Sequence, residues 1–135
     1  MSAVAADNFK ISGSYSYVDN GICADPVQVD GTYNEMLHSF YDNAGNGTRV
    51  SFTGKVTVKY TNLTNGSKYS PNVSGPGTID LATGQTVYRG GGVFDSSGRF
   101  IATDGRLVVD SHGNIISIVG HQTDVCAMLG STPAP

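Results

Sequence analysis

Tyrosine is the residue type that most clearly offers binding chemistry in this sequence. The chain of 135 residues contains 7 tyrosines and 5 phenylalanines but no tryptophan. A phenol joins an apolar ring to one hydroxyl group, so a tyrosine in a pocket can contact a ligand and also hydrogen-bond or protonate it. Tyr33 and Tyr60 are expected to face inward, which makes them candidate ligand-lining residues. The alternative is that they are core residues whose hydroxyl groups reach the end of the core.

The three histidines offer acid–base or metal chemistry. His38 lies in an apolar segment and could project into a ligand pocket as an acid or base; the alternative is a histidine satisfied in the core or at its rim. His112 and His121 each have an aspartate nearby, Asp110 and Asp124 respectively. Neither spacing is a known ligand signature, so we expect no metal site.

No motif of a known catalytic type is present. The nucleophile elbow G-x-S-x-G is absent, and the carboxylates are single residues that fall mostly in turns. The run Arg89-Gly90-Gly91-Gly92 lacks the spacing and the following helix of a phosphate loop. It predicts a bulged strand or a close approach of two backbones instead. The sequence therefore assigns no catalytic residue and no cofactor, and it favours a non-catalytic protein over an enzyme.

Composition narrows the class of protein further. Only 14% of the residues are charged, against about 25% in ordinary soluble domains, and 18 are glycines. This β-rich, turn-rich composition is typical of extracellular modules, so we expect a protein that is secreted or held at the cell surface. The formal net charge of −3 argues against nucleic-acid binding. No apolar run approaches the roughly 20 residues that a membrane span needs.

The clearest element is a strand over residues 49–61. Apolar and polar side chains alternate strictly there, which predicts a long half-buried strand with a bulge or bend at Gly54. Its apolar face would form one wall of a ligand cavity. The predicted lining residues, including the two tyrosines and the histidine introduced above, are Tyr33, His38, Val50, Phe52, Val56, Val58 and Tyr60.

Other segments repeat the strand pattern less strictly. They comprise residues 27–34, 78–81, 84–94, 99–109 and 114–120, together with 35–42, for which a strand is favoured over two helical turns. Turn signals separate them at Asn46-Gly47, Asn65-Gly66, Asp95–Gly98 and Asp110–Gly113. The count is seven or eight strands. Because an open sheet would expose a long edge, the sequence predicts a closed, antiparallel up-and-down β-barrel of about eight strands.

The two cysteines and the chain ends bear on compartment and domain boundaries. A disulfide between Cys23 and Cys126 is favoured over two buried thiols, since few charges and many glycines indicate an oxidising compartment. Four N-x-[ST] triplets, among them Asn62-Leu63-Thr64, are interpreted as turns rather than as glycosylation sites. The expected organisation is a flexible N-terminus over 1–8, left after removal of a signal peptide, one domain over 9–129, and a flexible tail over 130–135.

Several of these features together resemble a group of small secreted proteins of Gram-positive actinobacteria. The resemblance covers residues 23–129. It rests on Cys23 before Val27-x-Val29, on Thr61-Asn62, on Ser74-Gly75-Pro76-Gly77 and on Thr123–Leu129. It implies an eight-stranded calycin-like barrel, similar in outline to allene oxide cyclase and dirigent proteins. It carries no activity, and the active-site patterns of those two enzyme-like groups are not present here.

The leading functional hypothesis is a secreted, non-catalytic β-barrel that binds a small hydrophobic ligand or acts as a cell-surface module. One alternative is a cyclase or isomerase that works through the shape of its cavity. Another is an extracellular interaction or adhesion module that uses a tyrosine-rich surface. An open cavity would favour ligand binding or catalysis, and a filled interior would favour the interaction module. The oligomeric state follows from none of these patterns.

Overall fold

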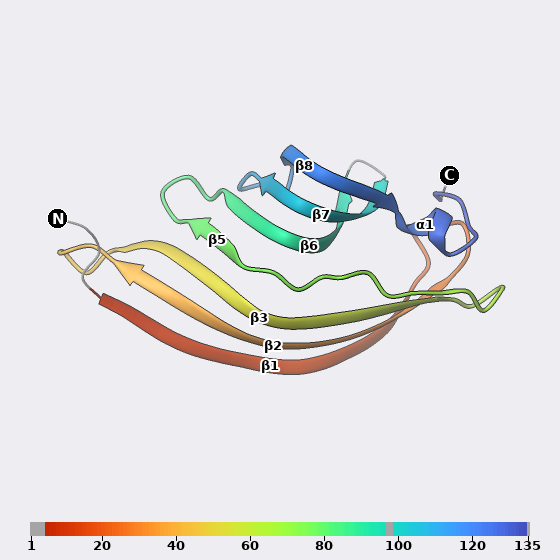
Figure 1. The fold of residues 1–135 in the computed structure, drawn as a ribbon, viewed down its shortest axis with the longest axis horizontal. Helices are drawn as coiled ribbons and strands as arrows, with labels where there is room; N and C mark the ends of the chain where they lie inside the picture. Colours follow the sequence, from red (N-terminus) through yellow and green to blue (C-terminus); the bar gives the residue numbers. More distant parts are fainter. Residues whose placement is uncertain (1–4, 97–98, 135) are drawn as a thin grey trace.

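The protein is built on one strongly curved antiparallel sheet (Figure 1). The computed structural model describes residues 5–96 and 99–134, so the predicted turn at Asp95–Gly98 lies partly outside the described residues. The strands are β1 (Ala5–Asp19), β2 (Val27–Tyr41), β3 (Gly47–Asn62), β4 (Lys68–Tyr69), β5 (Gly77–Asp80), β6 (Thr86–Ser96), β7 (Arg99–Val109) and β8 (Ile115–Asp124). One short helix, α1 (Val125–Met128), follows β8.

The all-β prediction is confirmed, and most predicted strands exist. β3 contains the predicted strand 49–61, and the segment 35–42 continues β2 as a strand rather than forming helical turns. The strand order is β1-β2-β3-β5-β6-β7-β8, with β4 paired to β3 outside this path. Gly54 stays in register opposite Glu35, so it marks a bend and not a bulge. The seven strands of this path form a meander in which each strand lies beside the next, and β4 is a two-residue addition to β3.

The sheet is not closed into the barrel that we expected, and this prediction is wrong. β1 and β8 are the two ends of the strand order, and each pairs with one neighbour among the described residues. Six successive antiparallel pairings lead from β1 to β8, because β4 lies off the path, so the two edge strands run in the same direction. An antiparallel seam between them is impossible. The result is an open trough (Figure 1).

A short irregular segment joins the two halves of the trough. β5 has only 4 residues, so much of the space between β3 and β6 is bridged by the residues before it. The Ser74 hydroxyl accepts from the Val56 N–H at 2.9 Å and donates to the Val56 carbonyl at 2.8 Å. On the other side, the Gly91 N–H donates to the Ser74 carbonyl at 3.3 Å. Ser74 therefore links the halves where regular strand pairing is missing.

A row of glycines lets the second half curl. Gly90, Gly105 and Gly120 lie opposite one another on β6, β7 and β8. Gly105 has a φ of 142°, and a Cβ placed there would lie 2.1 Å from the Val119 carbonyl oxygen. Only glycine fits such a bend. The segment 72–75 also runs against Gly91, where a Cβ would lie 1.8 Å from the Asn72 carbonyl oxygen, so the predicted close backbone approach at 89–92 is confirmed.

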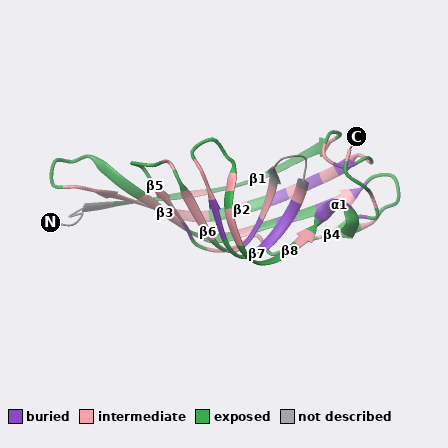
Figure 2. Cartoon of the chain, turned by 90° about the horizontal axis from the view of Figure 1, so that it is seen from above, coloured by how far each residue is buried: buried purple, intermediate pink, exposed green. Residues whose placement is uncertain are grey.

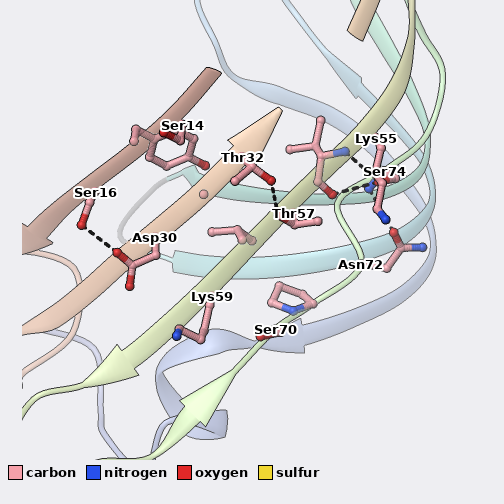
Figure 3. Close-up of a pocket in the computed structure, with 15 residues that line it drawn as sticks. Ser14, Ser16, Asp30, Thr32, Lys55, Thr57, Lys59, Ser70, Asn72 and Ser74 are labelled. Atoms are coloured by element: carbon pink, nitrogen blue, oxygen red, sulfur yellow. Dashed lines mark hydrogen bonds between the residues drawn. The ribbon is translucent and has the colours of Figure 1, made fainter. Parts of the chain in front are cut away.

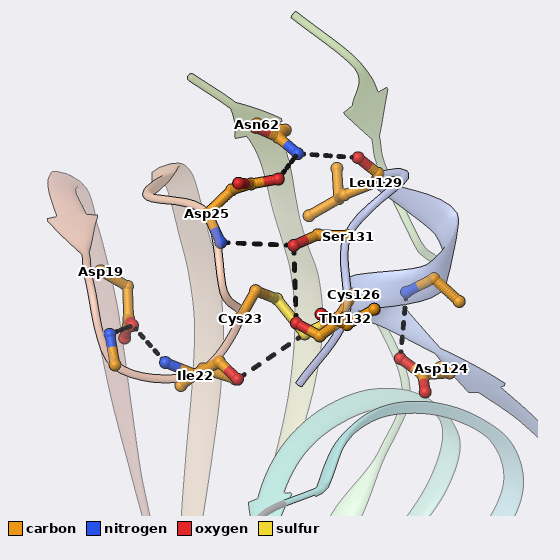
Figure 4. The surroundings of a disulfide bond; sticks show 12 residues. Asp19, Ile22, Cys23, Asp25, Asn62, Asp124, Cys126, Leu129, Ser131 and Thr132 are labelled. Atoms are coloured by element: carbon orange, nitrogen blue, oxygen red, sulfur yellow. Dashed lines mark hydrogen bonds between the residues drawn. A yellow bond between two sulfur atoms is a disulfide. The ribbon is translucent and has the colours of Figure 1, made fainter. Parts of the chain in front are cut away.

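The buried core lies at one end of the trough (Figure 2). Its centre is the predicted disulfide between Cys23 and Cys126 (Figure 4). The Cα atoms of the two cysteines are 5.6 Å apart. Cys23 lies in the connection between β1 and β2. The bond therefore ties the β1–β2 connection to α1. Residues packed around it include Val27, Val125 and Leu129.

Asn62 is a polar hub within this core (Figure 4). Its side chain is fully buried, and its amide N–H groups donate to Asp25 Oδ2 at 3.0 Å and to the Leu129 carbonyl at 2.9 Å. Its Oδ1 accepts from the Thr64 N–H at 2.9 Å. The triplet that begins at Asn62 thus serves a turn in the folded chain, as predicted, and its amide is not accessible for modification.

Both ends of the chain join the fold beyond the boundaries that the sequence suggested. Residues 5–8, expected in a flexible N-terminus, form the beginning of β1. In the expected C-terminal tail, the Ala24 N–H donates to the Thr132 carbonyl at 2.7 Å and the Ala134 N–H donates to the Ile22 carbonyl at 2.9 Å. Within the described residues, none of the helices has the length and apolarity to cross a membrane.

Candidate functional site

The concave face of the trough holds a groove of about 380 Å³. Side chains that alternate along β2 and β3 reach it from one side, since Tyr33 lies opposite Val56 and Val29 lies opposite Tyr60. β6 and the segment before β5 supply the other side. The lining residues include Tyr15, Tyr33, Glu35, Phe52, Val56, Val58, Tyr60, Val73, Tyr88, Arg89, Val93 and Phe94.

Most of the residues that were predicted to line a cavity meet in this groove. Tyr33, Phe52, Val56, Val58 and Tyr60 all line it. Two others lie elsewhere: His38 points to the opposite face of β2, and Val50 lies farther along β3, opposite Ile79 of β5.

The position of His38 follows from its spacing along β2. It is an odd number of residues from Tyr33 and Glu35, which line the groove, so it faces the other side of the sheet. There its Nδ1 lies 2.6 Å from Asn8 Oδ1. This hydrogen bond satisfies the imidazole at the surface, and the geometry gives His38 no part in the groove.

Aromatic rings hold the groove wall in a defined shape. The Tyr88 ring lies between two others, with its centroid 5.7 Å from that of Phe52 and 5.0 Å from that of Phe94. The Phe52 ring also covers Gly77, where a Cβ would lie 2.1 Å from it. Such tilted and edge-to-face pairs restrict each ring. The apolar wall is thus pre-formed, as in most ligand pockets.

The groove continues toward the disulfide as a second hollow of about 280 Å³. Tyr15, Tyr60 and Val93 border both spaces. The second hollow adds further apolar surface from Ile22 and Phe100, and the Tyr60 and Phe100 rings meet edge to face at 5.2 Å. The two spaces are adjacent along the inside of the sheet, and we call them together the concave groove.

Burial raises the pKa of two phenols in the concave groove. Burial raises the pKa of Tyr60 well above its usual value, with smaller contributions from nearby tyrosines. Burial also raises the pKa of Tyr88, and the negative charge of Glu35 adds to the effect. Glu35 and Arg89 bring ionisable groups to a mainly apolar wall. With Asp19 in the second hollow, the groove can therefore offer apolar surface, hydroxyl groups, two carboxylates and one guanidinium.

A wider hollow of about 890 Å³ lies on the convex face (Figure 3). Its side chains are mostly polar, and they are hydrogen-bonded to one another: Ser16 Oγ donates to Asp30 Oδ1 at 2.7 Å, and the hydroxyls of Thr32 and Thr57 form a hydrogen bond. These are the side chains expected on the solvated face of a half-buried sheet. Despite its greater volume, this hollow is a weaker candidate than the concave groove.

Several groove residues were missed in the sequence. Glu35, Arg89 and Phe94 come from β2 and β6, and no local pattern shows that these strands face one another. Tyr15 and Tyr17 had a signal, since they alternate with serines in the run Ser14–Tyr17. Among the described residues, no group of three or more histidines, cysteines or carboxylates could hold a metal ion.

No protein-family model, curated protein or solved structure matches the chain.

Proposed function

We propose that the protein binds a small, largely hydrophobic ligand in the concave groove. The supporting observation is the larger hollow of this groove, which has a volume of about 380 Å³ and a mainly aromatic and aliphatic lining held in shape by interlocked rings. This volume lies within the roughly 300–1,000 Å³ of typical small-molecule pockets, which are also mostly apolar with a few polar groups. No catalytic step is part of the proposal.

The lining also limits the chemistry of the ligand. Rings such as Phe52, Tyr88 and Phe94 favour a planar or ring-bearing molecule, which can stack against them. Neutral hydroxyl groups such as that of Tyr60 favour a ligand with a few hydroxyl or carbonyl groups. A strongly charged ligand would have to leave water for this wall without enough partners.

We also propose that the protein acts outside the cell. The Cys23–Cys126 disulfide supports this location, because structural disulfides persist in oxidising compartments. The low content of charged residues, 14%, points in the same direction.

Titration with N-phenyl-1-naphthylamine, an uncharged aromatic probe whose fluorescence rises in apolar sites, tests ligand binding. We expect saturable binding by the native protein and loss of it in Val56→Asp, which places a charge on the groove wall. Thr57→Asp is the matched control. It carries the same charge one residue along, on the solvated face, and should keep the probe.

Protein stability is measured alongside binding, because Val56→Asp could lower the folded fraction. Val73→Asp adds the same charge to the groove from the segment outside the strands and should also lose the probe. Absence of saturable binding by the native protein would contradict the proposal. Equal probe binding by folded Val73→Asp and Thr57→Asp would place the ligand somewhere other than the concave groove.

A further inference from the structure

The outer edge of β1 is long and unpaired. β1 spans 15 residues, or roughly 50 Å at about 3.3 Å per residue, and among the described strands it pairs with β2 alone. Alternate backbone N–H and C=O groups therefore point away from the sheet. Proteins commonly protect such edges with proline, bulges or several lysines. β1 has no proline, no register shift against β2 and a single lysine, Lys10.

Exposed apolar side chains gather on this same strand. Phe9 is 64% exposed, Tyr17 51%, Val18 45% and Tyr15 39%. An exposed apolar side chain on its own is ordinary, but several along one unpaired edge mark an interaction surface. A partner that extends the sheet would pair the backbone groups and cover part of these side chains at once.

We propose that this partner is a second copy of the chain, whose β1 pairs antiparallel with the first about a two-fold axis at Ser12. Ser12 is the middle residue of β1, so this register uses the whole strand. It places Phe9 opposite Tyr15 twice, once on each side of the axis. Aromatic cross-strand pairs of this kind stabilise antiparallel sheets.

The residues of β1 fit this register better than its neighbours. A shift of the axis to Ile11 keeps like charges apart but places Phe9 opposite Gly13 and Tyr15 opposite Asp7, so the aromatic pairs are lost. With the axis at Ser12, Asp7 lies opposite Tyr17 and Lys10 lies opposite Ser14, so no like charges meet directly. A shift of the axis to Gly13 would place Asp7 opposite Asp19 and shorten the overlap. A two-fold axis also keeps the concave faces of both copies on the same side of the joined sheet, because opposite residues share a face.

Charge variants at the axis test the proposal by multi-angle light scattering and sedimentation equilibrium. We expect the native chain of 14.1 kDa to dimerise across the micromolar range. Ser12→Glu and Ser12→Lys each place like charges opposite one another and should weaken the dimer several-fold. An equimolar mixture of the two variants should form a heterodimer, because opposite charges then meet at the axis.

Asn34→Glu is the matched control. Asn34 lies beside Ser12 on the same exposed face, but on β2, away from the edge, and it faces Lys55 on β3. This variant should dimerise like the native chain. A monomeric native chain throughout the range would overturn the proposal. Equal dimerisation of Ser12→Glu and Asn34→Glu would also overturn it, since the contact would then lie away from β1.

Discussion

At the scale of single residues, the buried phenol of Tyr60 makes the stability of the protein depend on alkaline pH. Burial raises the pKa of Tyr60 above its ordinary value of 10.0. The folded chain therefore holds this proton at a pH where the unfolded chain has released it. The resulting contribution to stability is fully present below pH 10 and is lost as the pH rises toward the pKa of folded Tyr60.

We accordingly expect the free energy of unfolding to fall above pH 10, by at most about 1.4 kcal/mol per pH unit for this one group. Tyr60→Phe, which has no proton to release, should show a shallower fall. Urea unfolding of both proteins between pH 8 and 11 measures the difference. Identical slopes would mean that Tyr60 ionises as freely in the folded protein as in the unfolded chain.

At the scale of elements, the glycine row across β6, β7 and β8 determines the curvature of the second half. Gly105→Ala should lower the free energy of unfolding by roughly 2–4 kcal/mol, because the new methyl group meets the Val119 carbonyl and the backbone conformation disfavours a side chain. Gly21→Ala is the control, since a Cβ there would meet only Asp19 Oδ1, at 4.0 Å. Thermal and urea unfolding would show the contrast. Equal stability of the two variants would mean that a side chain is tolerated at position 105 and that the close approach there does not require glycine.

At the scale of the whole molecule, one disulfide closes most of the chain into a loop. It spans a sequence separation of 103, and the chain-entropy model assigns a loop of that length about 4.7 kcal/mol. The double variant Cys23→Ala/Cys126→Ala should therefore lose about 4 kcal/mol or more, since a buried pair is also removed. Urea unfolding measures this loss. Native protein treated with reductant should lose a similar free energy of unfolding. A loss below 1 kcal/mol would show that the packing around α1 holds this end without the bond.

The features that could not be predicted from the sequence also belong to this largest scale. The strand at 49–61 was predictable because its alternation is a property of neighbouring residues. The open sheet was not predictable, because closure of the sheet into a barrel depends on how many strands lie in the path. The strand β1 was also overlooked, although Phe9, Ile11, Tyr15 and Tyr17 alternate there with polar residues. The wall of the groove that β2 and β3 form could be predicted from the same alternation. The wall that β6 forms could not be predicted, because it depends on contacts between segments far apart in the sequence.

The placement of the core at one end has a consequence for the motions of the trough. The buried side chains cluster at the disulfide end, whereas residues 32–57, all of them described, are partly or fully exposed. Local opening costs least where few apolar contacts are lost. The β2–β3 hairpin should therefore open locally more readily than the disulfide end. The concave groove lies where these two regions meet. Amide hydrogen exchange should accordingly be faster at the tip of this hairpin than around the disulfide, whereas the ring contacts between Phe52, Tyr88 and Phe94 keep the groove wall in shape.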